Sequence, residues 1–225
     1  MNTKRIAAAA ALAIGSFLST AAAPNWVATV TLTDGGHMIG NPAATVKLTE
    51  YISYTCPHCA AFAREGEEPL KLAYIAPGKL TLEVRHLLRD PVDLTAALLT
   101  NCGAPAKFPQ NHSAFMLSQN TWMPKMQAAT DAQTQRWFNG PNIARRRAIA
   151  SDLGFYAIME RRGYGRVAVD QCLGDEALAT RLADTAGREW KLPGIGGTPA
   201  FAINGTVLTG THNWASLEPQ LKARF

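Results

Sequence analysis

One short motif constrains the fold of this chain most: two cysteines separated by two residues, in the run Cys56-Pro57-His58-Cys59. The β-branched and aromatic run at 45–52 predicts a strand that ends just before the motif, and the residues after it follow a helical period. At such a strand-to-helix junction the first sulfur lies beside unbonded helix amides and the positive end of the helix dipole. Both favour thiolate over thiol. The motif therefore predicts an α/β unit with a reactive Cys56 and with Cys59 within disulfide reach.

The residues between the cysteines add to this prediction. His58 supplies a donor near Cys56 and, when protonated, a charge that stabilises the thiolate. A stabilised thiolate means a stabilised dithiol, so the disulfide form becomes a strong electron acceptor. Two alternatives stay open: half of a zinc site, although the sequence contains no second Cys-x-x-Cys, or an inert structural bridge.

The N-terminus predicts export. Residues 1–5 carry two positive charges, residues 6–18 are mostly Ala, Leu, Ile and Phe, and small residues follow at 19–23. This is the layout of a secretory signal peptide, and we assign residues 1–22 to it, with cleavage after Ala21 or Ala22. The alternative is an uncleaved anchor or a buried Ala-rich helix, although the run is shorter than the roughly 20 residues that span a bilayer. A periplasmic location would place all four cysteines in an oxidising compartment.

Composition excludes several classes of protein. The chain is 47% hydrophobic and 17% charged, which rules out intrinsic disorder. The formal net charge is +5, and Lys4 and Arg5 contribute to it from within the predicted signal peptide. A charge this small identifies no polyanionic partner, so we expect no nucleic-acid binding.

Strand patterns frame a long helical segment. Strands are expected at 27–32, 45–52 and 80–88, and a hairpin at 199–203 and 206–209 around the turn Asn204-Gly205. A last helix is expected to begin at Asn213 or Ser216. From residue 89 to residue 196 the periodic segments are all helical. Because the flanking strands are too few to stand alone, we expect a helical subdomain inserted into an α/β frame.

Capping residues mark several helices within this segment. Asp93 is expected to cap the first of them, residues near Asn142 to open another, and Asp175 to cap the last. All three have side chains that can accept a hydrogen bond from a free helix amide. These positions predict helices but no chemistry.

Two segments resemble a known family. EYISYTCPHC at 50–59, together with GTPAF at 197–201, resembles the thiol:disulfide oxidoreductases of the DsbA type. The resemblance covers nearly all of the mature chain in element order. It implies a thioredoxin fold with an inserted helical domain: residues 23–90 and 187–225 would form the discontinuous thioredoxin-fold domain, and residues 91–186 the insertion.

The resemblance also implies roles for individual residues. Cys56 would be the nucleophile of mixed disulfides, and Cys59 would resolve them. Glu50 would be the buried acid that relays the proton of Cys59. From the sequence alone, a Glu in a strand is as readily an edge residue that faces water.

Thr198-Pro199 matches the family's cis-proline, which faces the active-site cysteines. A residue without an amide hydrogen at a strand start leaves the preceding backbone, here Thr198, free to pair with an extended substrate peptide. Without the resemblance a trans proline would be expected, since most X–Pro bonds are trans. The best-known oxidases of this type carry Val before the proline, and isomerases often carry Thr. Thr198 therefore leaves open whether the enzyme is an oxidase or an isomerase.

The other two cysteines, Cys102 and Cys172, fall in the predicted insertion. Free thiols would be unusual in an oxidising compartment, so we interpret them as a structural disulfide. Some members of the resembled family have such an extra bridge. The alternative is a second redox relay, although neither cysteine has a partner at x-x spacing.

These observations predict an exported enzyme that donates its Cys56–Cys59 disulfide to reduced exported proteins. The dithiol carries both electrons, so neither a bound cofactor nor a metal is needed. The resemblance implies a quinone-linked membrane oxidase as the reoxidant. The alternatives are a disulfide isomerase or reductase and, from a different class, a metal-binding or metal-delivery module that uses Cys56 and Cys59 with His58.

Overall fold

The computed structural model describes residues 24–225, so the predicted signal peptide and its cleavage position lie outside the described residues. Six strands form one mixed sheet in the order β1-β2-β4-β3-β5-β6. β3 and β4 are parallel, and the other neighbouring pairs are antiparallel. The strands are β1 (Val30–Leu32), β2 (Gly36–Gly40), β3 (Val46–Ile52), β4 (Leu80–His86), β5 (Ala200–Ile203) and β6 (Thr206–Val207).

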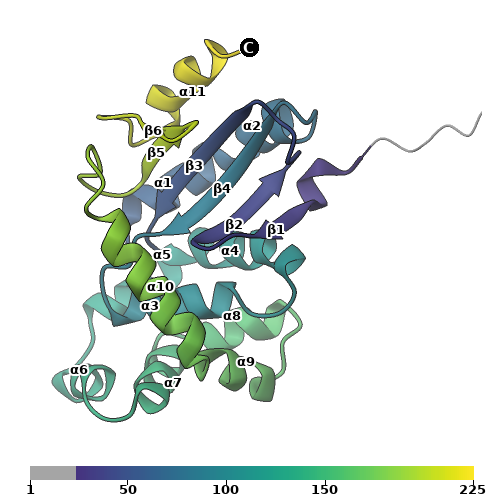
Figure 1. The fold of residues 1–225 in the computed structure, drawn as a ribbon. Helices are drawn as coiled ribbons and strands as arrows, with labels where there is room; N and C mark the ends of the chain where they lie inside the picture. Colours follow the sequence, from purple (N-terminus) through teal and green to yellow (C-terminus); the bar gives the residue numbers. More distant parts are fainter. Residues whose placement is uncertain (1–23) are drawn as a thin grey trace, which may run out of the picture.

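Helices pack on the sheet and build a separate helical layer (Figure 1). α1 and α2 follow β3, α3 to α9 form the layer beside the sheet, and α10 runs from that layer back to β4. This confirms the prediction of a thioredoxin fold with a helical insertion, although the expected boundary between residues 186 and 187 falls within α10. The helices are α1 (Pro57–Glu65), α2 (Glu67–Leu70), α3 (Pro91–Thr100), α4 (Phe108–Leu117), α5 (Gln119–Gln127), α6 (Asp131–Phe138), α7 (Asn142–Asp152), α8 (Phe155–Arg161), α9 (Arg166–Leu173), α10 (Glu176–Glu189) and α11 (Trp214–Lys222).

The first strands differ from the prediction. The segment expected as a strand at 27–32 begins with a 3-10 turn, Trp26–Ala28, and joins the sheet from Val30 onward. β2 is absent from the sequence prediction because its terminal glycines weaken the strand pattern. Gly36 is nevertheless required there, since a Cβ at this position would lie 1.9 Å from the carbonyl oxygen of Val84 on β4.

β3 positions the Cys-x-x-Cys motif. The strand is central in the sheet, between β4 and β5, and Leu48 and Ile52 on it are fully buried. Its register with β5 pairs Tyr51 with Ala200. The segment that contains Pro199 therefore lies beside the end of β3, next to the start of the motif.

Helix caps follow the sequence in part. Asp175 caps α10 and Asn213 caps α11, each with its side chain accepting from a first-turn amide, as predicted. The prediction for α3 is wrong, because Asp90 is the cap and accepts from the N–H of Asp93. Asp93 lies inside the first turn instead, where its carboxylate is free to make other contacts.

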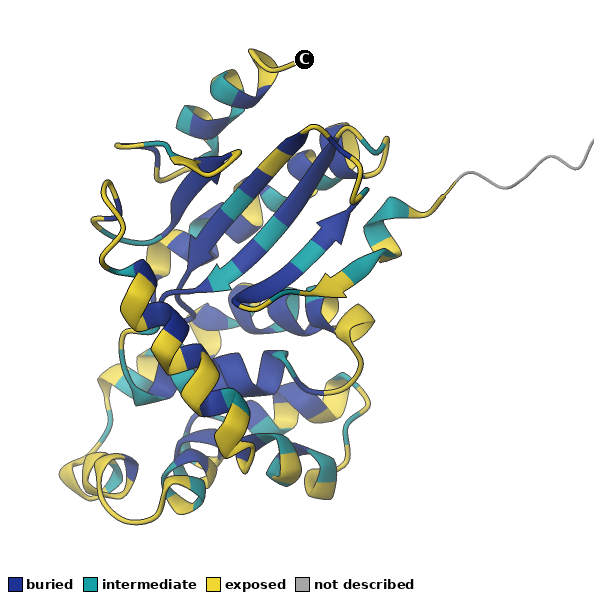
Figure 2. Ribbon diagram, in the orientation of Figure 1, coloured by how far each residue is buried: buried dark blue, intermediate teal, exposed yellow. Residues whose placement is uncertain are grey.

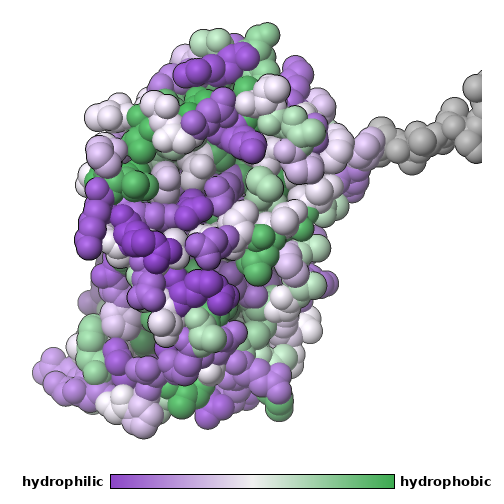
Figure 3. Space-filling model, viewed as in Figure 1, coloured by the Kyte–Doolittle hydropathy of each residue, from purple (hydrophilic) through white to green (hydrophobic). Residues whose placement is uncertain are grey.

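One continuous hydrophobic core joins the sheet to the insertion. Buried residues run from the sheet into the helical layer, and exposed residues lie along the outer sides of α6 and α10 (Figure 2). Phe115 and Trp122 both pack edge to face on Phe155 within the insertion. The surface over α10 is mostly hydrophilic (Figure 3). Among the described helices, none combines the length and apolar character required to cross a bilayer.

Candidate active site

The Cys-x-x-Cys motif begins α1 directly after β3. Cys56 is the N-cap residue of α1, and Pro57 takes the first helical position, where its missing N–H costs no helix hydrogen bond. Both cysteines are buried, with 3% of Cys56 and 1% of Cys59 exposed, whereas His58 between them is exposed. Both are free thiols, so the structure represents the dithiol state.

The Cys56 thiol has its pKa lowered to about 5. The hydrogen bond from the Cys59 side chain is the largest cause; burial raises the pKa, and the Thr198 side chain and the backbone amides of Cys59 and His58 lower it. The contribution of His58 is thus its backbone N–H, while its imidazole is exposed. Cys56 is consequently a thiolate at neutral pH, which is the nucleophilic form.

The Cys59 thiol shows the opposite behaviour. Its pKa is raised well above the usual value, first by burial, then by the hydrogen bond to Cys56 and by the charge of Cys56, with Glu50 adding a smaller effect. The backbone N–H of Ser53 lies 3.5 Å from its Sγ and acts in the other direction. When the pair carries a single proton, that proton is therefore on Cys59 and Cys56 is the thiolate.

The Thr198–Pro199 segment packs directly against Cys56. The peptide bond between these two residues is cis. The Sγ of Cys56 lies 3.0 Å from the carbonyl oxygen of Thr198, to which the thiol form donates. His212, which the sequence did not single out, fixes the same turn, because its Nδ1 lies 2.7 Å from the carbonyl oxygen of Pro199.

Glu50 lies on β3 with 2% of its surface exposed, so the alternative of a water-facing edge residue is wrong. Burial, followed by the charge of Glu67, raises its pKa well above the usual value. The Oε2 atom has no hydrogen-bond partner among the described residues. Burial therefore favours the protonated form of Glu50, and this carboxyl lies close enough to Cys59 to influence the pKa of that thiol.

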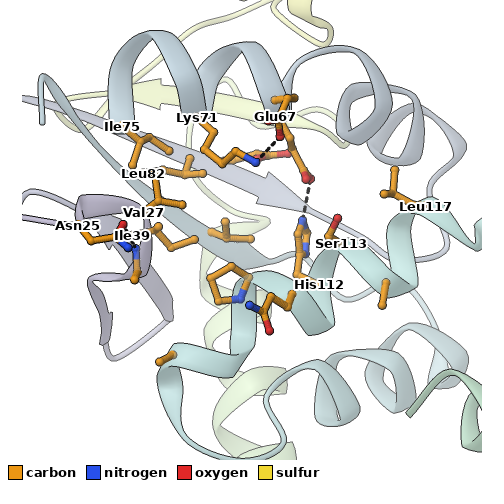
Figure 4. Close-up of a pocket in the computed structure, with 18 of the residues that line it drawn as sticks. Asn25, Val27, Ile39, Glu67, Lys71, Ile75, Leu82, His112, Ser113 and Leu117 are labelled. Carbon is orange, nitrogen blue, oxygen red and sulfur yellow. Dashed lines mark hydrogen bonds and ion pairs between the residues drawn. The ribbon is translucent and has the colours of Figure 1, made fainter. Parts of the chain in front are cut away.

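Glu50 also lines a cavity of about 680 Å³ (Figure 4). Apolar side chains of β2 and β4 form part of the lining. Across the cavity, Glu67 of α2 and His112 of α4 point toward each other, with 3.0 Å between Oε1 and Nε2. The other ring nitrogen of His112 lies 2.9 Å from the hydroxyl of Tyr54. Glu50, Glu67 and His112 thus line one cavity.

Three histidines gather around Phe108. His37 stacks on the Phe108 ring with centroids 3.8 Å apart, and His112 also stacks on this ring. His86 meets the ring in an edge-to-face arrangement. Burial, with a smaller effect from His112, lowers the pKa of His37 to about 4, and burial likewise lowers that of His86 to about 3. Within residues 24–225, no group of three His, Cys, Asp or Glu side chains is arranged to hold a metal ion.

The remaining cysteines, Cys102 and Cys172, form a disulfide within the insertion. Cys102 follows the end of α3, and Cys172 lies on α9. The bridge joins positions separated by 70 residues of sequence. It ties the start of the helical layer to its end.

Two residues that sequence reasoning missed hold the loop before the motif. Asp93 of α3 accepts hydrogen bonds from the side chain of Ser53 and from the backbone N–H of Tyr54. Gln119 of α5 donates to the carbonyl oxygens of Tyr54 and Cys56. Asp93 carried only a signal for capping, and nothing in the sequence around Gln119 points to the loop.

Comparison with known proteins identifies similar chains. A family model described as Thioredoxin matches residues 32–223. A Rickettsia conorii protein with the provisional name protein-disulfide oxidoreductase is 29% identical over 181 residues, which is 80% of this chain and 57% of that protein. The chain therefore spans somewhat more than half the length of this curated relative.

Solved structures are similar as well. A protein-disulfide isomerase from Novosphingobium aromaticivorans is 50% identical, with a TM-score of 0.82 over 86% of this chain and 98% of that one. The alpha-DsbA1 protein of Wolbachia pipientis shares the fold at 20% identity, with a TM-score of 0.67 over 86% of this chain and 92% of that one. The family model covers most of the chain and shows that the chain belongs to the thioredoxin family, and the solved structures share its fold.

Proposed function

We propose that the protein is a thiol:disulfide oxidoreductase that introduces disulfides into reduced proteins through Cys56 and Cys59. The observation that carries this proposal is the opposite shift of the two thiol pKa values, lowered to about 5 at Cys56 and raised at Cys59. A stabilised Cys56 thiolate stabilises the dithiol relative to the disulfide. The disulfide form is then a strong oxidant of other thiols.

The cycle begins with the enzyme disulfide. A substrate thiolate attacks Sγ of Cys56, the Cys56–Cys59 bond breaks, and the sulfur of Cys59 leaves with the electron pair. A second substrate thiolate then attacks the substrate sulfur of the mixed disulfide and releases Cys56 as a thiolate. The substrate loses two electrons and the enzyme gains them as a dithiol. Departure of Cys56 is favoured because its lowered pKa makes it a good leaving group.

Glu50 supplies the proton in this proposal. The departing Cys59 has a raised pKa and must be protonated, and Glu50 is a buried carboxyl whose raised pKa favours its protonated form and whose charge acts on Cys59. When the enzyme is reoxidised, Glu50 takes the proton back. The cavity beside Glu50 and the His112–Glu67 pair give this acid a polar environment for exchange.

Substrate peptides would bind beside Thr198 and Pro199. The backbone of Thr198 faces Cys56, and Pro199 has no amide hydrogen that would compete for a substrate carbonyl. An extended peptide laid along this segment places its cysteine next to Sγ of Cys56. Thr198 and Pro199 are therefore the proposed recognition residues.

The proposed setting is the periplasm. The basic, apolar and small-residue order of residues 1–22 supports export. Reduced exported proteins would then be the substrates. A quinone-linked membrane oxidase is the proposed reoxidant, and the dithiol needs no other cofactor for electron transfer.

Disulfide isomerase activity is the second candidate. Thr198 before the proline favours it, and so does the name of the 50% identical Novosphingobium protein. An isomerase works from the dithiol form, in which the Cys56 thiolate attacks a wrong substrate disulfide. A metal-delivery role lacks a third ligand group near Cys56 and Cys59 among the described residues.

Two parallel assays test the proposal. The oxidised protein is mixed with a reduced, unfolded model protein, and loss of substrate thiols is counted; the reduced protein is mixed with the scrambled-disulfide form, and recovery of native activity is followed. The proposal expects stoichiometric thiol loss in the first assay and a slower second reaction. With the scrambled-disulfide substrate, a Cys59→Ser variant should accumulate a mixed disulfide, because the Cys56 thiolate opens a substrate disulfide and no Cys59 remains to displace it, and Cys56→Ser should not. Rapid rescue of scrambled substrate without thiol oxidation would instead assign isomerase activity.

A further inference from the structure

The loop that carries the nucleophile is held by the helical insertion. Residues 53–55 connect β3 to Cys56, and all three are buried. The carboxylate of Asp93 on α3 accepts from the hydroxyl of Ser53 at 2.6 Å, from the N–H of Tyr54 at 2.8 Å and from the N–H of Arg89 at 3.1 Å. One side chain of the insertion thus fixes two consecutive residues of the loop.

A second side chain of the insertion holds the same loop from α5. The Nε2 of Gln119 donates to the carbonyl oxygen of Tyr54 at 2.7 Å and to that of Cys56 at 3.0 Å. Gln119 is 5% exposed, so these bonds are made away from water. Its two amide hydrogens therefore set the position of the backbone on each side of Thr55.

Helix stability does not explain Asp93. The capping role at α3 belongs to Asp90, whose side chain accepts from the Asp93 N–H at 2.8 Å. Asp93 is 1% exposed, and burial raises its pKa to about 7 against the hydrogen bonds that lower it. A buried carboxyl is costly unless each oxygen is bonded, and here both oxygens bond to the loop or to its neighbour.

The held loop contacts the reacting sulfurs. The N–H of Ser53 reaches Sγ of Cys59 at 3.5 Å, and the carbonyl of Cys56 that Gln119 holds belongs to the nucleophile itself. The Cys59 side chain is in turn the largest stabiliser of the Cys56 thiolate. A small shift of the loop changes these short-range interactions, since their strength falls steeply with distance and angle.

We propose that Asp93 and Gln119 are positioning residues that set the thiolate of Cys56, and thereby the oxidising strength of the Cys56–Cys59 pair. This inference rests on the proposed thiol–disulfide exchange. The helical insertion is then part of the redox centre as well as a layer of the fold. Substitution of Asp93 or Gln119 then alters the redox couple even though every cysteine stays in place.

Four variants test the proposal in the full chain. Asp93→Asn replaces an acceptor with a donor that faces the Arg89 N–H, and Gln119→Met removes both donors at similar size. Ser53→Ala removes a single donor to Asp93 and keeps the charge of Asp93. The control is Arg146→Met, because Arg146 is a buried side chain of the same insertion that bonds the Leu173 carbonyl and Glu176 instead of the loop.

Each variant is measured for thermal stability, for the pKa of Cys56 by thiolate absorbance, and for the equilibrium constant with glutathione. We expect Asp93→Asn and Gln119→Met to raise the Cys56 pKa and to make the disulfide form less oxidising by about tenfold, with Ser53→Ala in the same direction and smaller. Arg146→Met should lose stability with both redox readouts unchanged.

Two results overturn the proposal. Unchanged redox readouts in the variants that fold, with stability losses like that of Arg146→Met, would make the contacts purely structural. A lowered Cys56 pKa in Asp93→Asn, with no change in Ser53→Ala and Gln119→Met, would assign Asp93 a charge effect. If Asp93→Asn does not fold, Gln119→Met and Ser53→Ala decide the outcome. Failure of the wild-type protein to exchange with glutathione at all would refute the proposed function itself, a separate result.

Discussion

The sulfur of Cys56 lies 3.0 Å from the carbonyl oxygen of Thr198, a residue 142 positions further along the chain. The contact exists because β5 pairs with β3 in a register that brings residue 200 beside residue 51. The nucleophile and the proposed recognition segment are therefore fixed by the same sheet. A substrate held at Thr198 is presented to Cys56 without further movement of the frame.

The side chain of Thr198 should tune Cys56. It lowers the Cys56 pKa, so Thr198→Val is expected to raise that pKa and to shift the glutathione equilibrium toward a less oxidising pair by up to about tenfold. Thiolate absorbance against pH checks the first effect. Thr206→Val, an exposed substitution in the same hairpin, is the matched control. Equal pKa values in both variants would contradict the role of Thr198.

Glu50 should make the stability of the protein fall as the pH rises above the ordinary pKa of a carboxyl group. Its pKa is raised in the folded state, so the native protein binds its proton more tightly than the unfolded chain. Its contribution is fully present below the unfolded pKa and is lost as pH rises through the folded pKa. Glu50→Gln is expected to remove this loss, so that the free energy of unfolding changes less as the pH rises above the ordinary pKa of a carboxyl group.

Denaturant unfolding at a series of pH values measures the effect of Glu50. Glu68→Gln is the control, because Glu68 lines the same cavity but is exposed and paired with Lys71. Glu50→Gln should also slow the return of Cys59 to the disulfide, since no carboxylate remains to accept the proton of Cys59. A pH profile of unfolding identical to that of the wild type would show that burial does not raise the pKa of Glu50.

His37 should make the protein sensitive to acid. Its pKa is lowered to about 4 in the folded state, so its contribution to stability is present above about 6.5 and is lost as pH falls through about 4. His37→Phe keeps the ring stacked on Phe108 and removes the titration. Between these two pH values, the free energy of unfolding of the variant is expected to fall by up to about 3 kcal/mol less than that of the wild type. An acid limb of the unfolding profile in His37→Phe identical to that of the wild type would contradict this role of His37.

The Cys102–Cys172 disulfide should contribute to stability and not to thiol–disulfide exchange. Replacing both cysteines with Ala is expected to lower the free energy of unfolding by about 4 kcal/mol, because the bridge spans 70 residues. The glutathione equilibrium of Cys56 and Cys59 should be retained. Loss of exchange with full stability would point to a second redox relay through the bridge.

The sequence was sufficient to predict the elements that have local signals. The strand before the motif, the hairpin at Asn204-Gly205 and the caps at Asp175 and Asn213 are each set by residues that lie close together in the chain. β2 escaped prediction because its glycines serve a close approach to β4 and leave no alternating pattern.

The site was predictable at the motif and not around it. Asp93 contacts Ser53 across 40 positions, and Gln119 contacts Tyr54 across 65. His212 holds the Pro199 turn through a ring nitrogen that no local pattern marks. Such contacts depend on how the insertion packs against the sheet. This packing involves residues far apart in the sequence, so no short sequence pattern predicts it.

The reduction potential of the Cys56–Cys59 pair decides whether the protein oxidises other thiols. The oxidised and reduced protein is equilibrated with glutathione mixtures, and each state is counted after alkylation. Because the Cys56 thiolate is stabilised and Cys59 holds its proton, the account predicts a potential more oxidising than about −180 mV. A thioredoxin-like value near about −270 mV would contradict it and would indicate a reductase.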